Sequence, residues 1–374
     1  MSRRPPPRAR RQHGAALLTA LITVTLVATL AAAALWRQWR ATEVEAAERS
    51  RMQASLLLSG ALDWSRLILA EDGRTGNVDH LAEPWAVPLA EAKLTSFLAA
   101  DKNVASDAIE GLPDAFLSGA ITDAQSRLNL RNLVDASGQP VKNAVAAVRK
   151  LFDLLDLPAG QVDTLVQQMR QALLAGGGVT AAPPATTGTG SATAAAATGA
   201  APATGTGDTA TAPPAAGNNP DAGAAADGAP LMPQRVEQLG WLGLPAETIT
   251  ALAPYVTLLP VGNTTVNLNT ASAEVLYAAV DQLDMAGARK LVEVRRRKFF
   301  AKLEEASQQL GSATNVQLAP TEVGVATNYF EVRGRLRLDH HWVEEVSLLH
   351  RTGITVTIVW RRREAGLLAR PAAG

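Results

Sequence analysis

The 374-residue sequence predicts an α+β fold in which a long N-terminal transmembrane helix packs on an antiparallel sheet and a large all-helical domain is inserted in the chain. Three observations support this prediction. Residues 15–36 contain no charge and lead into a further helical pattern, residues 131–320 show mainly helical spacing, and residues 329–360 alternate apolar and polar side chains in three runs. The first pattern indicates a membrane span and the last indicates strands.

Composition excludes several classes of protein. The chain has 35 basic and 35 acidic residues, so it is not a globally basic nucleic-acid binder. It has no Cys, which excludes disulfide scaffolds, Cys-ligated zinc sites and thiol catalysis. The charge is unevenly distributed, because residues 1–14 contain five Arg and no acid, and the rest of the chain has 30 basic and 35 acidic residues.

The uncharged segment 15–36 has the length of a membrane-spanning helix. At about 1.5 Å per residue it extends roughly 33 Å, against a bilayer core of about 30 Å. Trp36 and Trp39 follow it, as in an interfacial aromatic belt, and the Arg residues before it predict a cytoplasmic N-terminus and an exported body. The alternative is a secretory signal cleaved near residues 31–34, but such signals have apolar stretches of only about 7–15 residues.

The same helix is expected to continue beyond the membrane. From Arg37 to about Leu69 there is no Pro, and Gly60 is the only Gly. A polar stretch comes first, containing Glu43, Glu45, Glu48, Arg49 and Arg51. An apolar stripe that should pack on the body follows, made of Leu56, Leu57, Trp64, Leu67 and Ile68. Asp72–Gly73 is the expected end of the helix.

A short basic leader ends in Gly14 directly before the apolar helix. This junction resembles the leader of type IV pilin-like proteins. The resemblance implies that the prepilin peptidase cuts between Gly14 and Ala15 and methylates the new amine of Ala15. Most members of that group begin with Phe and carry Glu at the fifth mature position, where this chain has Ala15 and Thr19. The protein K family of minor pseudopilins in type II secretion is the branch that lacks this Glu.

Two further blocks resemble the protein K family. Residues 79–89 are expected as loop and extended chain, since their two prolines preclude a helix, and they contain an acidic-Pro-Trp-Ala stretch. Residues 119–130 are expected as a strand and turn and contain Asp-Ala-Gln-Ser-Arg. The family usually has Gly where this chain has Ser126, and often Asn where it has Arg131.

Residues 141–174 are expected to form two helices separated by Pro158-Ala159-Gly160. Apolar side chains recur every three or four positions in each half, which indicates faces that pack into a core. These side chains are Val141, Val145, Val148, Phe152 and Leu155, and then Val162, Val166, Met169 and Leu173.

Residues 176–230 have the composition of a disordered insertion. Of these 55 residues 48 are Gly, Ala, Thr or Pro, and none is aromatic or basic. The family usually has an acidic stretch in this neighbourhood, where this chain retains only Asp208, Asp221 and Asp227.

Structure is expected to resume at Leu231, with a helix that carries Ile249, Leu252 and Val256. The segment Asn267-Leu268-Asn269-Thr270-Ala271 then precedes a helix. We expect Asn269 or Thr270 to cap that helix, Glu274 to lie in its first turn, and Val275, Leu276 and Ala279 to be buried. This block is typical of the protein K family.

The same block resembles the helix-hairpin-helix segment of DNA-binding proteins, in which backbone N–H groups at a Gly-rich hairpin contact phosphate. Here residues 283–288 contain one Gly, and Asp281 and Asp284 would repel phosphate. The basic run from Arg289 to Lys298 is typical of a solvated helix face. A membrane-anchored helix-hairpin-helix DNA-binding protein is therefore the alternative to a pseudopilin.

The C-terminal part predicts an antiparallel meander. Residues 329–338, 342–350 and 354–360 read as strands, and residues 351–353 read as a turn with Gly at its end. The apolar face of this sheet needs a cover, which the amphipathic half of the N-terminal helix can supply. A helix packed on a sheet in this way is the pilin-like fold, with residues 131–320 inserted as in the protein K family.

No pattern indicates catalysis, and the sequence predicts a protein that is not an enzyme. There is no H-E-x-x-H, Gly-rich phosphate loop or G-x-S-x-G. Asp339, His340 and His341 are adjacent and could suggest a metal site. Neighbouring strand residues point to opposite faces of a sheet, so these side chains cannot converge on one metal ion. A third hypothesis, a periplasmic hydrolase with a signal anchor, therefore has no residues to support it. No cofactor is required. The family resemblance makes Ca²⁺ a candidate ligand, but no D-x-D-x-D loop is present and no ligands are assigned.

The resemblance to the protein K family therefore implies a minor pseudopilin at the tip of the type II secretion pseudopilus, supporting export of folded proteins. The expected partners are the minor pseudopilins I and J, other pseudopilins, the prepilin peptidase and the membrane, without nucleic acid. The expected location is the bacterial inner membrane, with one span, a cytoplasmic N-terminus and a periplasmic body. The expected layout is a leader (1–14), a span (15–36), a pilin-like part (37–130), a helical insertion (131–320), strands (321–364) and a tail (365–374).

Overall fold

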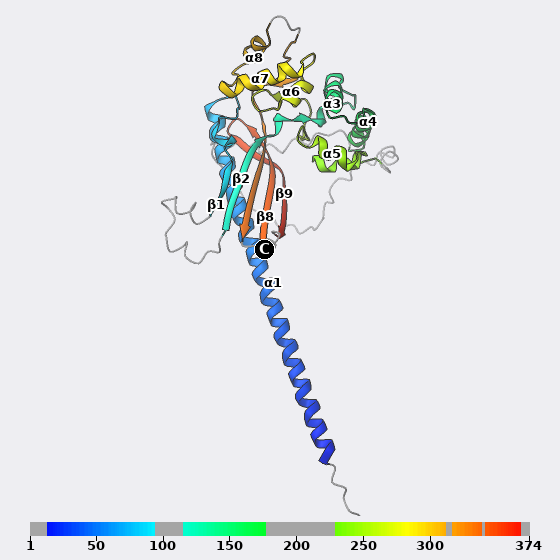
Figure 1. Ribbon diagram of the computed structural model, residues 1–374, viewed down its shortest axis with the longest axis vertical. Coiled ribbons are helices and arrows are strands. Elements are labelled where there is room, and N and C mark those ends of the chain that lie inside the picture. Colours follow the sequence, from blue (N-terminus) through cyan, green and yellow to red (C-terminus); the bar gives the residue numbers. More distant parts are fainter. Residues whose placement is uncertain (1–12, 94–114, 177–228, 312–315, 339–340, 368–374) are drawn as a thin grey trace, which may run out of the picture.

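The computed structural model describes residues 13–93, 115–176, 229–311, 316–338 and 341–367. Its dominant feature is one 63-residue helix, α1 (His13–Thr75), which extends away from a folded body packed around its C-terminal part (Figure 1). Its segment Ala16–Glu45 is apolar and long enough to cross a membrane, and none of it is buried within the chain. The predicted single long helix is confirmed, and it ends two residues beyond the expected stop.

The body contains a five-stranded sheet in the order β1-β2-β7-β8-β9, with every neighbouring pair antiparallel. The predicted meander corresponds to β7, β8 and β9. β9 runs seven residues past the predicted third strand, which ended at residue 360, and three residues past the predicted strand region 321–364. The five strands are β1 (Leu89–Lys93), β2 (Ala115–Asp123), β7 (Tyr329–Leu338), β8 (His341–Thr352) and β9 (Thr355–Leu367). The α+β fold class is confirmed.

The face of α1 that covers the sheet differs from the predicted stripe. The buried side chains on α1 are Ala54, Leu58, Leu62 and Leu69, which pack against residues of β7 and β8 such as Leu336 and Leu349. Three members of the predicted stripe are exposed: Leu56, Trp64 and Leu67. The prediction was wrong because α1 carries two apolar faces, and spacing along one helix does not say which of them meets the sheet.

Gly73, the expected end of α1, lies inside the helix and contacts the turn between β8 and β9. The helix continues to Thr75, and a Cβ atom at Gly73 would collide with the carbonyl oxygen of Gly353 in the β8–β9 turn. Gly353 has a φ of 57°, a left-handed conformation that glycine adopts without strain. Glycine is therefore required at position 73 for the end of α1 to approach this turn, and glycine at 353 suits the turn conformation.

A helical region with its own core lies between β2 and β7 in the chain. Its α-helices are α3 (Lys142–Leu154), α4 (Gly160–Ala175), α5 (Ala246–Leu252), α6 (Ala273–Ala279), α7 (Met285–Arg297) and α8 (Leu303–Leu310). In Figure 1 these helices lie around the end of the sheet that is farthest from the N-terminus of α1. Two short parallel pairs brace the region: β3 (Leu128–Asn129) with β4 (Val256–Thr257), and β5 (Val266–Asn267) with β6 (Val323–Gly324).

Most of the predicted core of this region is buried as expected. Phe152 and Met169 are fully buried, whereas Val145 and Leu155 are only partly buried at the edge of the core. Val256 lies in β4 rather than on the predicted helix.

The cap of α6 is Ser272, whose hydroxyl accepts from the backbone N–H of Val275 at 3.3 Å. The predicted caps have other partners, which is why the prediction was wrong. The side-chain amide of Asn269 exchanges two hydrogen bonds with the backbone of Phe300, and the hydroxyl of Thr270 donates to Asp123.

Candidate assembly surface

An exposed apolar surface runs along one side of α1, beyond the segment that could cross a membrane. Leu56, Trp64 and Leu67 are 75%, 60% and 66% exposed, although they lie beside the folded body. Scattered apolar residues are ordinary on a protein surface, but a contiguous set marks a site of interaction. These three residues are the side of α1 that the sheet leaves uncovered.

Beside this face lies a cavity of about 560 Å³, bounded by α1 and the sheet. Leu56, Gly60 and Trp64 line its α1 side. Its far wall is the segment that joins α1 to β1, with Trp85, Val87 and Leu89, and its floor includes Leu117, Gly119 and Ile121 of β2. We call these residues of α1, the connecting segment and β2 the α1 groove.

The far wall of the α1 groove is held in place by Trp85. This side chain is 1% exposed and meets Phe330 edge-on, with ring centroids 5.2 Å apart. Its indole N–H donates to the Glu83 carboxylate at 2.6 Å, and the backbone N–H of His80 donates to the same oxygen at 3.0 Å. Burial raises the pKa of Glu83 to about 7. The predicted acidic-Pro-Trp-Ala block thus fixes the path of the chain before β1.

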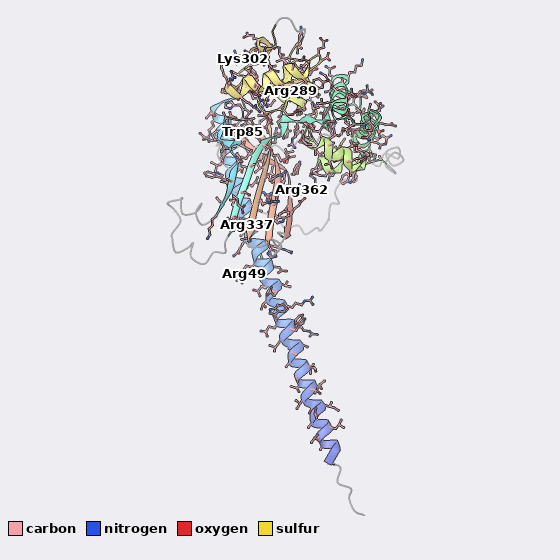
Figure 2. All side chains as sticks on the ribbon, viewed as in Figure 1. Arg49, Trp85, Arg289, Lys302, Arg337 and Arg362 are labelled. Atoms are coloured by element: carbon pink, nitrogen blue, oxygen red, sulfur yellow. The ribbon has the colours of Figure 1, made fainter. Side chains whose placement is uncertain are left out.

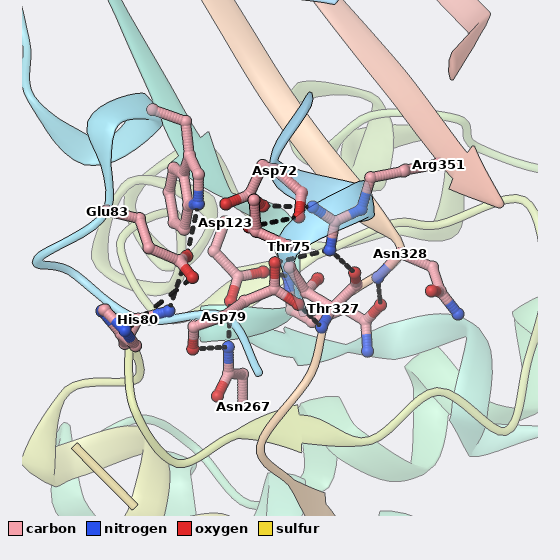
Figure 3. A network of polar contacts seen from close by, with 12 residues as sticks. Asp72, Thr75, Asp79, His80, Glu83, Asp123, Asn267, Thr327, Asn328 and Arg351 are labelled. Atoms are coloured by element: carbon pink, nitrogen blue, oxygen red, sulfur yellow. Dashed lines mark hydrogen bonds and ion pairs between the residues drawn. The ribbon is translucent and has the colours of Figure 1, made fainter. Parts of the chain in front are cut away.

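A polar network joins the end of α1 to the sheet (Figure 3). The guanidinium of Arg351 on β8 pairs with Asp72 of α1 and with Asp79, the latter at 2.5 Å, and donates to the carbonyl of Thr327 at 3.1 Å. The backbone N–H of Thr327 donates to the other Asp79 oxygen at 2.7 Å. Burial raises the pKa of Asp79 to about 6, and the Arg351 charge and the Thr327 hydrogen bond oppose that shift.

The same network continues into the helical region through Asp123, the last residue of β2. Its carboxylate is buried and accepts from the Asn267 amide at 2.9 Å, the Thr270 hydroxyl at 2.6 Å and the backbone N–H of Gln125 at 2.7 Å. Burial is the largest cause of its raised pKa, and these hydrogen bonds oppose it. Asn267 also donates to the backbone carbonyl of Asp79 at 3.1 Å.

Two blocks that the sequence analysis treated separately therefore meet in space. The Asp-Ala-Gln block ends β2, and the Asn-x-Asn-Thr block begins the segment before α6; they are joined by the hydrogen bonds to Asp123. Their role in this structure is to lock the helical region onto the sheet. Arg351 and Asp79, which the sequence analysis missed, complete this network.

The acidic part of this network does not fit a calcium ion. Carboxylate oxygens of Asp72, Asp79 and Glu83 lie within 4.8 Å of one another. However, Arg351 pairs with both aspartates, and Glu83 accepts from Trp85 and from a backbone amide. Calcium requires about six to eight oxygens free to converge on it. Two of the three carboxyl groups are already paired with Arg351 and the third accepts two hydrogen bonds, so no calcium site is assigned.

The helix-hairpin-helix-like segment is present as α6 and α7, but its hairpin is closed to phosphate. Asp284 caps α7, and its carboxylate accepts from the backbone N–H of Gly287 at 2.7 Å. An acid therefore occupies the position where a phosphate would meet backbone amides. Arg295 points inward and donates to the carbonyl of Leu268, and burial lowers its pKa to about 10. This geometry does not favour the DNA-binding alternative.

The predicted processing residues lie at the start of α1. Gly14 and Ala15 are in its first turns, and the hydroxyl of Thr19 donates to the carbonyl of Ala16 at 3.0 Å. The leader before His13, residues 177–228 of the predicted insertion, and Asp339 with His340 lie outside the described residues. Cleavage between Gly14 and Ala15 remains a prediction.

Comparisons with known proteins identify relatives along the whole chain. Two family models described as type II secretion system protein K match residues 126–261 and 266–327, together more than half of the sequence. The type II secretion system protein K of Pseudomonas aeruginosa is 28% identical over 378 residues, covering 95% of this chain and 90% of that protein. The one from Pectobacterium carotovorum is 26% identical over 364 residues, covering 94% and 96%.

A solved structure shows the same fold. It is described as the GspK-GspI-GspJ complex from the type 2 secretion system of enterotoxigenic Escherichia coli. One of its chains matches with a TM-score of 0.54 and 16% identity, covering 85% of this chain and 98% of the other. The chain therefore belongs to the type II secretion system protein K family, a structural component of a secretion system and not a known class of enzyme.

Proposed function

We propose that this chain is a minor pseudopilin at the tip of the type II secretion pseudopilus and supports export of folded proteins across the outer membrane. The observation that carries this proposal is the α1 groove, an apolar surface that the described residues leave uncovered, on a helix that continues from a segment able to span a membrane. The family is a component of the type II secretion system, and the structural relative is described as a complex with GspI and GspJ. We infer that the corresponding I and J pseudopilins are the partners of this chain.

The geometry of α1 supports a partner helix beside it. A partner subunit of the same architecture is anchored in the same bilayer by its own N-terminal helix. That helix would lie beside α1 where the two helices leave the bilayer. The exposed polar stretch of α1, with Glu43, Glu48 and Arg51, comes first and can fix the register by charge pairing. The α1 groove follows and offers apolar area to the partner.

Thr19 supports the tip position. By the family resemblance, the fifth mature residue is usually a Glu that pairs with the amine of a neighbouring subunit. The hydroxyl of Thr19 instead donates within its own helix and carries no charge. A subunit at the end of a filament has no subunit beyond it and can do without that ion pair.

The same proposal includes processing and orientation. The prepilin peptidase cleaves between Gly14 and Ala15 and methylates Ala15, which removes the five leader Arg residues. Those Arg residues first hold the N-terminus on the cytoplasmic side. The body then lies in the periplasm and acts as a structural part of the pseudopilus, alongside its other pseudopilins.

The test is copurification of the I and J pseudopilins with the full-length chain extracted from membranes. A charge placed in the α1 groove by Trp64→Glu should reduce recovery of both partners at least about tenfold, because it introduces an unpaired carboxylate into an apolar contact. Trp241→Glu is the matched control, since Trp241 is 51% exposed on the helical region. Equal recovery from the two variants would remove the α1 groove from the assembly interface.

A further inference from the structure

A strongly basic surface lies at the end of the body opposite the membrane helix. Residues 285–302 contain seven basic residues and one acid in a chain that is neutral as a whole. Figure 2 labels Arg289 and Lys302 at this end, far from Arg49 on α1. The exposed basic residues of this segment that form no ion pair within the described residues define what we call the basic face: Arg289, Lys290, Arg297, Lys298 and Lys302.

Internal structural roles do not account for this charge. Arg295 is used inside the fold, where it donates to Leu268, and Arg296 pairs with Glu293 at 2.6 Å. Cations also favour the C-terminal end of a helix, but that effect is complete within the last turn. Arg289 lies two turns earlier, and within the described residues the basic face has no acidic partner. The positive charges of the basic face therefore lie close together and repel one another.

The surroundings of the basic face favour carboxylates on a protein over a phosphate backbone. Asp284 already occupies the N-terminus of α7, and Glu293 interrupts the positive surface, so a continuous line of phosphates would meet two acids. Phe299, which is 37% exposed and stacks on His80 with ring centroids 3.8 Å apart, provides an apolar margin. Arg side chains near an exposed aromatic ring are typical of a protein–protein contact.

We propose that the basic face binds an acidic surface of a folded protein that approaches the end of the body opposite the membrane helix. The inference rests on the proposed function, because a body at the pseudopilus tip presents this end outward. Complementary charge would speed the encounter and fix the orientation of the incoming protein.

The cellular test compares two charge-matched variants of the full chain in its own host. Arg289→Glu with Arg297→Glu reverses the basic face, and Lys142→Glu with Arg170→Glu makes the same charge change on exposed positions of α3 and α4. The first variant should lower the extracellular amount of secreted protein at least about tenfold, with unchanged recovery of I and J, and the control should lower neither. Loss of I and J together with secretion would assign the basic face to pseudopilus assembly and overturn the proposal. Unchanged secretion, or an equal loss in the control, would also overturn it.

A binding assay on the detergent-solubilised chain separates the classes of partner. The probes are poly-L-glutamate, a short DNA duplex and phosphatidylglycerol vesicles, each over a salt series. Poly-L-glutamate should bind most tightly, and the variant with Arg289→Glu and Arg297→Glu should weaken its binding at least about tenfold, more at low salt than at high salt. Tighter binding of DNA or of vesicles at the same salt concentration would contradict the proposal and favour nucleic acid or an anionic membrane.

Discussion

The side-chain amide of Asn267 donates to the carboxylate of Asp123 at 2.9 Å, and both residues are buried. Asp123 ends a strand of the sheet, and Asn267 lies in β5 of the helical region, 144 positions away in the chain. This contact is the centre of the network that holds the two parts of the body together. Breaking this contact should therefore lower the free energy of unfolding of the whole body.

Replacing Asn267 with Ala should destabilise the protein by about 2–4 kcal/mol, because the buried Asp123 carboxyl group and the Asp79 carbonyl each lose a donor and the backbone N–H of Asn269 loses its acceptor. Urea unfolding of the solubilised chain measures this change. Asn143→Ala is the control, since Asn143 donates to Glu322 at an exposed site and should cost below about 1 kcal/mol. Equal effects of the two changes would mean that the Asp123 network does not hold the body together.

Replacing Arg351 with Met should cost about 3–5 kcal/mol, because Asp72 and Asp79 would remain buried without their cation. Adding Asp79→Asn should recover part of that loss, since it removes one of the two uncompensated charges. The control is Arg149→Met, which breaks an exposed pair with Asp163 and should cost about 0–1 kcal/mol. Thermal or urea unfolding that shows no difference between Arg351→Met and this control would contradict the assigned role of Arg351.

Glu83 predicts a dependence of stability on pH. Its pKa rises from an ordinary 4.5 to about 7 in the folded chain, so between these values the folded state binds a proton that the unfolded state has released. The free energy of unfolding should therefore fall as the pH rises through this window, by up to about 3 kcal/mol from this group. Glu83→Gln keeps an acceptor for the indole N–H of Trp85 but cannot ionise. It should therefore flatten the dependence of the unfolding free energy on pH above pH 6, where Asp79, with a pKa of about 6, contributes less to that dependence. Identical slopes for the wild-type and Glu83→Gln proteins would show that Glu83 is ionised in the folded state.

Replacing Gly14 with Leu should leave the full-length precursor in the membrane, because the peptidase is expected to require a small residue before the cut. Intact mass of the extracted protein distinguishes the precursor from a chain that begins with N-methylated Ala15. Gly60→Ala is the control and should be processed normally, since Gly60 lies far along α1 with open space around it. Processing of the Gly14 variant, or a mature N-terminus near Ala34, would refute the assigned junction.

The elements that follow from local pattern were predicted well. An uncharged run, helical spacing and strand alternation depend on neighbours in the chain, and they gave the membrane helix, α3 with α4, and the β7–β9 meander. The side of α1 that meets the sheet was not predictable in this way, because Leu58 and Trp64 both lie on apolar faces and the sheet selects between them.

The contacts of the network were less accessible to sequence reasoning. Asp123, Asn267 and Arg351 are single polar residues in distant segments, and no spacing rule connects them. The family resemblance identified the two segments that contain Asp123 and Asn267, but it did not show which contacts these residues make. The cap of α6 was predicted wrongly for the same reason. Asn269 and Thr270 form hydrogen bonds with Phe300 and Asp123, which are distant in the sequence, and do not cap the helix.

We expect the chain to assemble with the I and J pseudopilins instead of polymerising with itself. The most direct measurement is the molar mass in solution of a body beginning near Arg40 mixed with the I and J bodies, by size-exclusion chromatography with light scattering. Residues 16–45 are not buried against the described part of the chain, so we expect the body to keep its fold when the residues before Arg40 are removed. We expect one species that contains all three bodies. A body that elutes alone from every mixture, or that forms long homopolymers, would contradict it.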